Sequence, residues 1–196
     1  MKKLLFTICA GVTLTLAGNN LAEASVQTHT VQSGDTLYKL GQQYSVSFES
    51  IKQLNDKSSS AIYVGETLTI PAAVSSEERD LLARLIHSEA QGEPYAGKVA
   101  VATVVLNRVH HSEFPNSIKK VINEVHASGH YAFTPVQNGS IQQPADAEAK
   151  KAAQEAIAFQ GQGQGSIFFY NPEIATNHWI ATQTETIRIG NHVFAK

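Results

Sequence analysis

The feature that most constrains the fold is a stretch of largely apolar sequence, YAGKVAVATVVLNRV, at positions 95–109. Its apolar residues fall on most sides of a helix rather than along one stripe, and a helix of that kind has to be buried. Pro94 stands just before it, and proline is favoured in the first turn of a helix. We therefore expect a central helix that starts at Pro94 and is covered by neighbouring segments.

The segment before this helix carries an acidic residue on an otherwise apolar face. Leu82, Leu85, Ile86 and Glu89 recur at helical spacing, which places all four on one side of a helix over residues 77–91. A carboxyl group among apolar side chains favours its protonated form. The partial negative charge at a helix C-terminus acts in the same direction, so Glu89 is a candidate general acid of the lysozyme type.

The ends of this helix fix where Glu89 lies. The S-x-x-E pattern at 75–78 is a capping box that marks the start of the helix. Gly92 ends it, so Glu89 falls in the last turn, at the bend before the central helix and within reach of an open cleft. The alternative is a structural glutamate paired with Arg84 or Arg108.

The rest of this half is helical first and rich in strands last. The patterns predict helices over 114–125 and 144–159, the second ended by Gly161, then a strand over 166–170 and a hairpin over 186–195. The turn of the hairpin is the Gly-Asn pair in TIRIGNHVFA. The sequence therefore indicates an α+β domain.

The first 24 residues have the pattern of a secretory signal peptide. Two lysines precede a short apolar run, and Ala-Glu-Ala closes the segment as a small-x-small cleavage site. The run is shorter than the roughly 20 residues of a membrane span. We expect a secreted protein that starts near Ser25 without a stable membrane span; an uncleaved anchor is the alternative. Cys9, the only cysteine, leaves with the signal, which excludes a cysteine nucleophile and a disulfide.

Residues 28–71 form a separate unit that is polar and rich in serine. The predicted order is strand, helix, helix, strand, at 28–32, 36–44, 48–55 and 66–71. Asp35, in the turn after the first strand, is a candidate cap for the first helix. A unit of about 45 residues is marginal for an independent core, so the two strands should pair while both helices cover one face.

This unit resembles the LysM carbohydrate-binding module. The likeness rests on HTVQSGDTLYKLGQQYSVSFESIKQLN and IYVGETLTIP, which cover nearly all of it. The resemblance implies a βααβ fold and binding to N-acetylglucosamine-containing glycans such as peptidoglycan. It also implies a groove between two loops, with glycan contacts at Gly34, Asp35, Thr36, Ile62 and Tyr63. Residues 72–76 are then a short linker.

Residues 77–196 resemble the catalytic domain of the SleB/CwlJ family of bacterial cell wall hydrolases. The likeness rests on LLARLIHSEAQGEPYAGKVAVATVVLNRV, FTPVQNGSI, FFYNPEIAT, NHW and RIGNHVFAK, in that order. It implies a mainly helical, lysozyme-superfamily-like fold with a C-terminal β-hairpin. It further implies cleavage of the glycan strand between N-acetylmuramic acid and N-acetylglucosamine, with Glu89 as the acid. The expected location is the cell wall, vegetative or in the spore envelope.

Most glycosidases use two carboxylates, and this domain has no clear second one. Glu93 lies four residues from Glu89 and is a candidate on the substrate side. However, it directly precedes Pro94, where a carboxylate commonly caps the next helix. A lytic transglycosylation with Glu89 as sole general acid and base, giving a 1,6-anhydro product, therefore fits better. Attack by water would make the same site a muramidase, and the sequence leaves both outcomes open.

A sugar groove needs flat apolar faces and amide groups. The candidates for substrate binding are Tyr170, Asn171, Gln137, Asn138 and Phe133. Tyr170 is the preferred residue for orienting the acid or the N-acetyl group, with a core aromatic as the alternative. Phe133 and Trp179 fit the core better than the groove, because aromatic side chains dominate burial.

Two other functions compete. A zinc-dependent N-acetylmuramoyl-L-alanine amidase would need ligands from scattered histidines, since H-E-x-x-H is absent and Gly129 argues against a helix between His126 and His130. A non-catalytic glycan-binding wall protein would need a structural Glu89. We expect no cofactor and no metal. The net charge of −2 gives no case for nucleic acid, so the expected partner is the peptidoglycan glycan strand.

Overall fold

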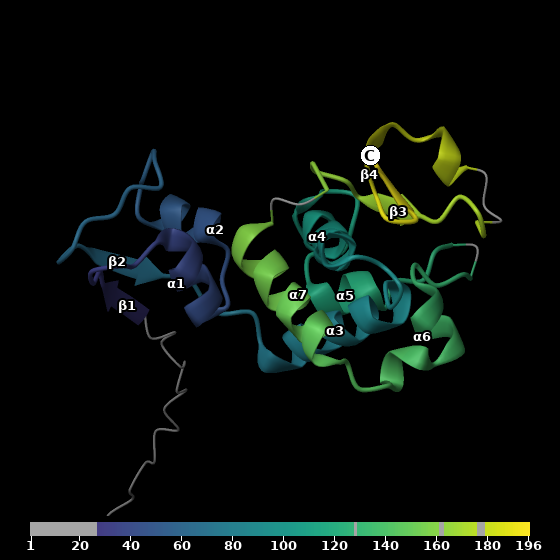
Figure 1. Cartoon of the computed structure of the whole chain (residues 1–196), viewed down its shortest axis with the longest axis horizontal. Coiled ribbons are helices and arrows are strands. Elements are labelled where there is room, and N and C mark those ends of the chain that lie inside the picture. Colours follow the sequence, from purple (N-terminus) through teal and green to yellow (C-terminus); the bar gives the residue numbers. More distant parts are fainter. Residues whose placement is uncertain (1–26, 128, 161–162, 176–178) are drawn as a thin grey trace, which may run out of the picture.

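The computed structural model describes residues 27–127, 129–160, 163–175 and 179–196. It has two hydrophobic cores, a small one between Val31 and Ile70 and a larger one from Leu82 onward. We call the two parts the N-terminal and C-terminal domains; Figure 1 shows them side by side with one short connection. Helices combined with small antiparallel sheets confirm the predicted α+β class. The predicted signal, residues 1–24, lies outside the described residues.

The N-terminal domain has the predicted order of strand, helix, helix, strand. Its elements are β1 (Gln27–Thr30), α1 (Leu37–Tyr44), α2 (Phe48–Leu54) and β2 (Thr67–Ile70). The strands pair antiparallel, with Gln27 opposite Ile70. Leu40, Ile51 and Leu68 are fully buried, so both helices and β2 contribute to one core.

The cap of α1 differs from the prediction by one residue. The Thr36 hydroxyl, not Asp35, accepts a hydrogen bond from the backbone N–H of Lys39, at 3.2 Å. The Asp35 carboxylate accepts instead from the backbone N–H of Gln32 at 2.7 Å and pairs with His29 at 2.9 Å. These contacts lower the pKa of Asp35. Asp35 therefore closes the turn between β1 and α1, which leaves the helix to be capped by its neighbour.

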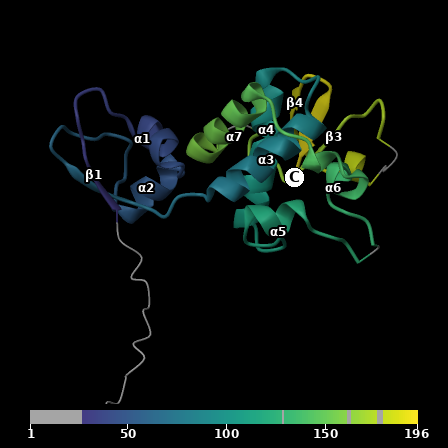
Figure 2. The same ribbon diagram turned by 90° about the horizontal axis from the view of Figure 1, so that it is seen from below.

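The C-terminal domain is built around α4 (Tyr95–His110), as the sequence predicts. Every residue from Gly97 to Leu106 is buried. α3 (Ser76–Glu89) and α7 (Ala147–Phe159) pack on α4 and on each other, and the short α5 (Ile118–Ile122) packs on α3 and α4. Figures 1 and 2 show α3, α4 and α7 next to one another, with α7 on the side that faces the N-terminal domain. The apolar sequence of α4 thus supplies the core on which the other helices lie.

A three-stranded antiparallel sheet lies on the side of this domain away from the N-terminal domain (Figure 1). Its strand order is β3 (Phe168–Tyr170), β5 (His192–Ala195), β4 (Glu185–Ile189). The whole of β5 is buried, and Phe194 joins the main core. Gly190 and Asn191 form the predicted hairpin turn. Gly190 has a φ of 58°, a backbone conformation that glycine adopts without strain.

The structure departs from the predicted helices in several places. The helix expected over 114–125 is confined to α5, because Ser117 is extended and its hydroxyl caps the helix that follows. Pro94 is the N-cap of α4 rather than its first helical residue. α6 (Thr134–Asn138) was not predicted, and neither were the single 3₁₀ turns at Ser140–Gln142 and Ile180–Thr182.

The end of α7 also differs from the expectation. The cap is Gln160, in the left-handed conformation with a φ of 50°, while Gly161, the predicted stop, lies outside the described residues. Across the described part of the chain, no helix combines the length and the apolar character needed to cross a membrane.

Candidate active site

Glu89 is the last residue of α3, at the bend that leads into α4. The helix starts where predicted, because the Ser75 hydroxyl accepts a hydrogen bond from the backbone N–H of Glu78 at 3.2 Å. Leu85 and Ile86, one turn before Glu89, are fully buried. Packing therefore fixes the backbone of Glu89, and its side chain lines a cavity.

The Glu89 carboxyl has neither a hydrogen bond nor an ion pair within the described residues. The two arginines considered as partners are engaged elsewhere: Arg84 pairs with Asp80 at 2.9 Å, and Arg108 Nε donates to the Ile167 carbonyl at 2.7 Å. Burial raises the pKa of Glu89 to about 7, because a charged carboxylate loses its hydration there. The group thus keeps a substantial protonated fraction at neutral pH.

A cavity of about 410 Å³ opens beside Glu89. Its lining comes from α3, α4, β3, β5 and the segments around α6 and the second 3₁₀ turn: Glu89, Arg108, Ala132, Phe133, Thr134, Phe169, Tyr170, Asn171, Ile174, Ala175, Ile180 and His192. Of the acidic residues that the structure describes, Glu89 alone belongs to this lining. The cavity therefore presents one carboxyl to a ligand.

A second cavity, of about 970 Å³, continues from the first. Both share Arg108, Ala132, Thr134 and Ile180 in their linings, so together they form one cleft. The second part is wider and is bordered by Glu113, Glu124, Tyr131 and Trp179. A cleft of this size accommodates an extended ligand with Glu89 towards one end.

Arg108 stands where the two cavities meet. It is 7% exposed, and its guanidinium lies 5.0 Å, 5.1 Å and 5.7 Å from the ring centres of Phe114, Phe133 and Phe168. Burial lowers its pKa to about 10, which still leaves it charged at neutral pH. Its Nη1 has no hydrogen-bond partner among the residues that the structure describes. The cleft thus contains a poorly hydrated cation held among aromatic rings.

His192 lines the Glu89 cavity from the sheet side. The residue is 6% exposed, and its ring packs 5.2 Å from that of Phe169. Burial is the main influence on its pKa and lowers it, so the imidazole is neutral at pH 7. Within the described part of the chain, its Nδ1 is buried without a hydrogen-bond partner. A buried ring nitrogen left unpaired beside a cavity is a group that a ligand can satisfy.

The structure brings together some of the substrate-side residues named from the sequence and leaves others apart. Tyr170 and Asn171 line the Glu89 cavity, as does Phe133, which is 3% exposed and also belongs to the core. Gln137 and Asn138 are exposed on α6 and are absent from the described lining of either cavity. Asn138 Oδ1 accepts from the backbone N–H of Ser140 at 2.9 Å, which is a turn-stabilising role.

Two expectations about nearby residues were wrong. Glu93 caps no helix; its carboxylate accepts from Asn191 Nδ2 and from the backbone N–H of Asn191, because the hairpin turn lies against the α3–α4 bend. Glu93 is not in the described lining of the cleft. Trp179 is not a core residue: it is 56% exposed and borders the wider cavity, packing edge-on against Phe168 at 5.4 Å.

Sequence reasoning considered Arg108 only as a possible partner of Glu89 and did not single out His192. Both are brought to Glu89 by tertiary contacts. The hairpin sequence TIRIGNHVFA contained one usable signal for His192. This histidine starts the otherwise apolar strand HVFA directly after the turn, and a histidine is less often fully buried than the apolar residues that follow it.

Among the residues proposed from the LysM resemblance, the structure gives each a different setting. Gly34 has a φ of 90°, and Thr36 caps α1. Ile62 is half-buried against the small core, whereas Tyr63 is 71% exposed. Of these residues, Thr36 also borders a groove that Glu155 and Phe159 of α7 line as well.

No set of three histidine, cysteine, aspartate or glutamate side chains with the geometry of a metal site occurs in the described parts of the chain. His126 and His130 are not in a helix, as Gly129 between them predicts: the backbone N–H of His126 donates to the His130 carbonyl at 2.9 Å. His178 is outside the described residues.

Fold and site together define a class: a two-domain protein in which a small βααβ domain accompanies a helical domain that holds an unpaired, protonatable carboxyl in a cleft, as in lysozyme. Residues 92–195, more than half of the chain, match the Cell Wall Hydrolase family, and residues 29–71 match the LysM domain. The chain belongs to the Cell Wall Hydrolase family and carries a LysM domain. Both resemblances seen in the sequence are confirmed.

Individual relatives agree with this assignment. The chain is 37% identical over 131 residues to a spore cortex-lytic enzyme of Halalkalibacterium halodurans and 39% identical over 127 residues to one of Bacillus cereus. These matches cover 67% and 65% of this chain. They cover only 38% and 47% of the relatives, so the chain spans less than half the length of the curated relatives it matches.

A solved structure, described as the catalytic domain of the germination-specific lytic transglycosylase SleB from Bacillus anthracis, is 38% identical in sequence. The likeness has a TM-score of 0.57 and covers 65% of this chain and 100% of that one. The C-terminal domain therefore has the fold of that catalytic domain.

Proposed function

We propose that this protein cleaves the glycan strand of peptidoglycan between N-acetylmuramic acid and N-acetylglucosamine, as a lytic transglycosylase with Glu89 as its only general acid and base. The observation that carries the proposal is the state of the Glu89 carboxyl. It is unpaired among the described residues, it faces a cleft, and its pKa is raised to about 7. An acid with that pKa can both donate and accept a proton near neutral pH.

The reaction needs only this one carboxyl. Protonated Glu89 gives its proton to the glycosidic oxygen as the bond to C1 of N-acetylmuramic acid breaks and an oxocarbenium-like state develops. The carboxylate then takes the proton from the C6 hydroxyl of the same sugar while O6 bonds to C1. The product is a 1,6-anhydro sugar, and Glu89 is again protonated for the next cleavage.

Other residues of the cleft support this assignment by their chemistry. Tyr170 and Asn171 offer a phenol and an amide next to Glu89, groups that fit sugar hydroxyls and the N-acetyl carbonyl. Arg108 supplies a fixed positive charge, which suits the carbonyl or carboxylate oxygens carried by the lactyl ether of muramic acid. These three positions are substrate-binding in the proposal, and Glu89 is catalytic.

Mass spectrometry of digested, purified glycan strands tests the proposal directly. We expect anhydro-muramic ends from the wild type and none from Glu89→Gln, whose amide retains the size of the side chain but cannot donate an acidic proton. Reducing muramic ends would favour hydrolysis by water instead. Freed stem peptides would favour an amidase. Either result would replace the transglycosylase assignment.

Hydrolysis would use a second carboxylate to activate the attacking water. Glu124 borders the wider cavity, and its Oε2 is buried with no hydrogen-bond partner in the described residues. Glu124→Gln should leave the anhydro product unchanged if Glu89 acts alone. A change from reducing to anhydro ends in that variant would mean that Glu124 normally activates a water. Glu113→Gln, another acid of the same cavity, is the control.

The N-terminal domain has a binding role in this proposal. Its membership of the LysM family supports attachment to peptidoglycan, and we infer a secreted protein that acts in the cell wall. The names of the relatives point to spore cortex as one substrate. Comparing digestion of purified cortex with that of vegetative walls would decide between the two substrates.

A further inference from the structure

A groove of about 540 Å³ lies where the two domains meet. It shares no lining residue with the Glu89 cleft. The N-terminal domain supplies Thr36, Leu37, Tyr38, Phe48 and Ser60 to its lining, and α7 of the C-terminal domain supplies Glu155 and Phe159. The groove is therefore made by two domains, with aromatic rings from both.

Direct contacts hold these walls in place. The Phe159 ring stacks on that of Phe48, with centroids 5.8 Å apart and 17° between the planes, and meets Tyr38 edge-on at 6.3 Å. Gln154, also on α7, donates a hydrogen bond to the Gln42 carbonyl at 3.1 Å. Phe159 is nonetheless 41% exposed, so part of its ring remains available to a ligand.

The backbones of the two domains also come close. A methyl group added at Gly41 of α1 would lie 2.8 Å from the Val46 carbonyl oxygen and 3.4 Å from the Ala158 side chain of α7. The backbone N–H of Val74, in the connection between the domains, donates to the Ser45 carbonyl at 3.0 Å. The short connection is thus tied down at its middle, and the groove has a defined shape.

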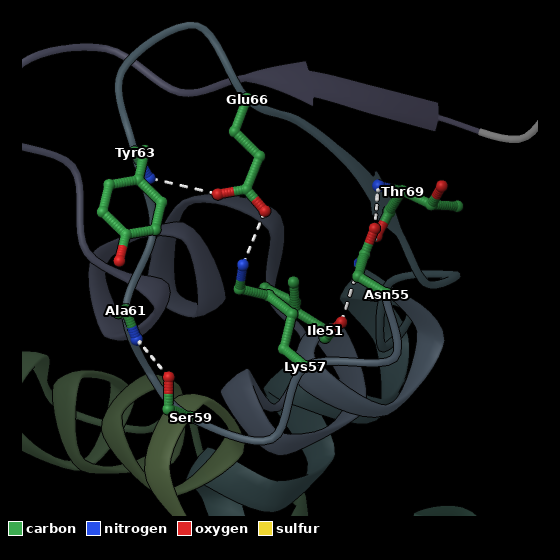
Figure 3. A network of polar contacts seen from close by, with 8 residues as sticks. All are labelled: Ile51, Asn55, Lys57, Ser59, Ala61, Tyr63, Glu66 and Thr69. Carbon is green, nitrogen blue, oxygen red and sulfur yellow. Dashed lines mark hydrogen bonds and ion pairs between the residues drawn. The ribbon is translucent and has the colours of Figure 1, made fainter.

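On the N-terminal side, Leu37 and Tyr38 of α1 and Phe48 of α2 form most of the groove wall, and each of the two loops in which the LysM resemblance places the glycan site adds one residue. Thr36 ends the loop after β1, and Ser60 belongs to the loop between α2 and β2. Figure 3 shows how that second loop is fixed: the Glu66 carboxylate accepts from the backbone N–H of Tyr63 at 3.1 Å and from the Lys57 ammonium. The ribbon of α7 runs close to this loop in the same view.

A further bridge anchors the base of the loop. The Asn55 side chain donates to the Ile51 carbonyl and accepts from the backbone N–H of Thr69, both at 2.7 Å. This ties the end of α2 to β2. The loop that carries Ser60 therefore starts and ends at fixed points, as a binding surface requires.

The chemistry of the groove suits an uncharged glycan. Its lining combines three aromatic rings with three hydroxyls, those of Thr36, Tyr38 and Ser60, and one carboxylate, which is the mixture of apolar walls and few polar groups typical of ligand sites. No lysine, arginine or histidine is among its described lining residues. Stem peptides of peptidoglycan carry carboxylates, which a groove with only Glu155 as its charged group would repel. The sugar backbone is the part of the polymer that fits.

We propose that α7 completes the glycan groove of the LysM domain, so that one chain of N-acetylated sugars contacts Thr36 and Ser60 on one side and Phe159 and Glu155 on the other. Phe159 offers its ring to the apolar face of a sugar. Glu155 accepts a hydrogen bond from the Tyr95 hydroxyl at 2.7 Å and has a further oxygen for a sugar hydroxyl. The inference rests on the proposed function, because it takes peptidoglycan glycan as the ligand.

The test is calorimetric binding of an N-acetylglucosamine hexamer to the full chain carrying Glu89→Gln, so that binding is read without cleavage. Phe159→Ala in this background should weaken binding roughly threefold to tenfold, the range expected for one lost stacking contact. Glu155→Gln, which keeps the size of the side chain, should weaken it by a smaller factor. Phe159→Leu keeps the apolar volume without the ring and should resemble Phe159→Ala.

Gln154→Ala is the matched control, because it removes a contact between the same helix and the N-terminal domain without touching the groove. It should bind the hexamer as the parent does. Equal weakening in Gln154→Ala and Phe159→Ala would mean that both act by loosening the domains, and would overturn the proposal. Unchanged binding in Phe159→Ala, or no binding of the hexamer by the parent, would overturn it as well. Melting curves identify any variant that fails to fold.

These outcomes separate this inference from the proposed activity. Phe159→Ala with Glu89 intact should give the same cleavage product as the wild type, at a lower rate on insoluble walls. If no glycan bond is cleaved but hexamer binding depends on Phe159, the activity proposal fails and the groove stands.

Discussion

The Glu93 carboxylate accepts two hydrogen bonds from Asn191, one from its backbone N–H at 3.0 Å and one from its side-chain Nδ2 at 3.1 Å. The two residues are far apart in the chain, one at the α3–α4 bend and the other in the β4–β5 turn. The contact joins the sheet to the bend that carries Glu89. The residue after Asn191 is His192, which lines the Glu89 cavity.

Removing this contact should destabilise the C-terminal domain. Glu93 is buried, and hydrogen bonds to charged groups are worth about 1.5–3 kcal/mol each, so Glu93→Ala should lower the free energy of unfolding by at least about 2 kcal/mol. Urea denaturation measures this. Glu185→Ala, at an exposed position of the same hairpin, should change stability by less than about 0.5 kcal/mol. Similar losses of unfolding free energy in Glu93→Ala and Glu185→Ala would show that the buried contact stabilises the domain no more than an exposed side chain does.

The same junction leaves no space for a side chain at Gly190. A methyl group there would lie 2.0 Å from Glu93 Oε2 and 2.7 Å from Pro94 Cδ, and the backbone φ is 58°. Gly190→Ala should therefore cost both backbone strain and displacement of Glu93, about 3 kcal/mol or more. Thermal unfolding would show this as a clear fall in Tm.

Gly139→Ala separates the two costs of that substitution. Gly139 has a φ of 81° but nothing within 4 Å of an added methyl group, so only the backbone cost of about 1–2 kcal/mol applies. If Gly190→Ala lowered stability no more than Gly139→Ala, the hairpin turn would not pack closely on Glu93.

The parts of the fold that could be predicted were those with a local physical signal. The burial of α4 follows from apolar residues on most of its sides, and the place of Glu89 follows from helical spacing together with a cap before it and Gly92 after it. The hairpin followed from its Gly-Asn turn. In each case the relevant interactions lie within about one helix or one hairpin, so the sequence order carries them.

What could not be predicted depends on contacts between distant segments. Arg108 and His192 reach the Glu89 cavity only because α4 and β5 pack in one domain, and neither position has a spacing that reveals this. Glu93 was expected to cap α4, a local role, but a turn from the end of the chain competes for its carboxylate. α6 has five residues, too few for apolar periodicity to show.

The raised pKa of Glu89 predicts a pH-dependent stability change in Glu89→Gln. The ordinary value is 4.5 and the folded value about 7, so the folded state binds the extra proton, and wild-type stability falls as pH rises from about 4.5 to 7. The glutamine variant has no such loss. At pH 8 it should be more stable than the wild type by about 3 kcal/mol, and at pH 4 by almost nothing.

Urea denaturation at several pH values tests this, with Glu113→Gln as the control, since Glu113 is exposed. The control should show no comparable gain at pH 8. A Glu89→Gln variant that is equally or less stable than the wild type at pH 8 would mean that the carboxylate is well solvated or paired when the protein is folded.

Activity should follow the same ionisation. If protonated Glu89 donates to the glycosidic oxygen, kcat/KM for glycan cleavage should fall by about tenfold per pH unit above pH 7, the pKa of the free enzyme. Glu89→Gln should lose about 10²-fold to 10⁴-fold at every pH, the usual contribution of a general acid. A profile that is flat from pH 6 to pH 9 would exclude Glu89 as the titrating acid.

His192 offers the last test, because it lines the same cavity as Glu89 and its Nδ1 has no partner among the described residues. A neutral imidazole that bonds the substrate should, on replacement by His192→Phe, cost about tenfold to a hundredfold in kcat/KM, with little loss of stability, since phenylalanine fills the space between Phe169 and Phe194. Burial lowers the pKa of His192, so His192 does not titrate above pH 7. The pH at which activity falls, set by Glu89, should therefore be the same in His192→Phe as in the wild type. Steady-state kinetics across pH 5–9 measure both quantities. If the fall of activity above pH 7 moved by a pH unit in His192→Phe, His192 would act by setting the ionisation of Glu89 instead. If kcat/KM changed by less than twofold, the substrate would not use the ring nitrogen of His192.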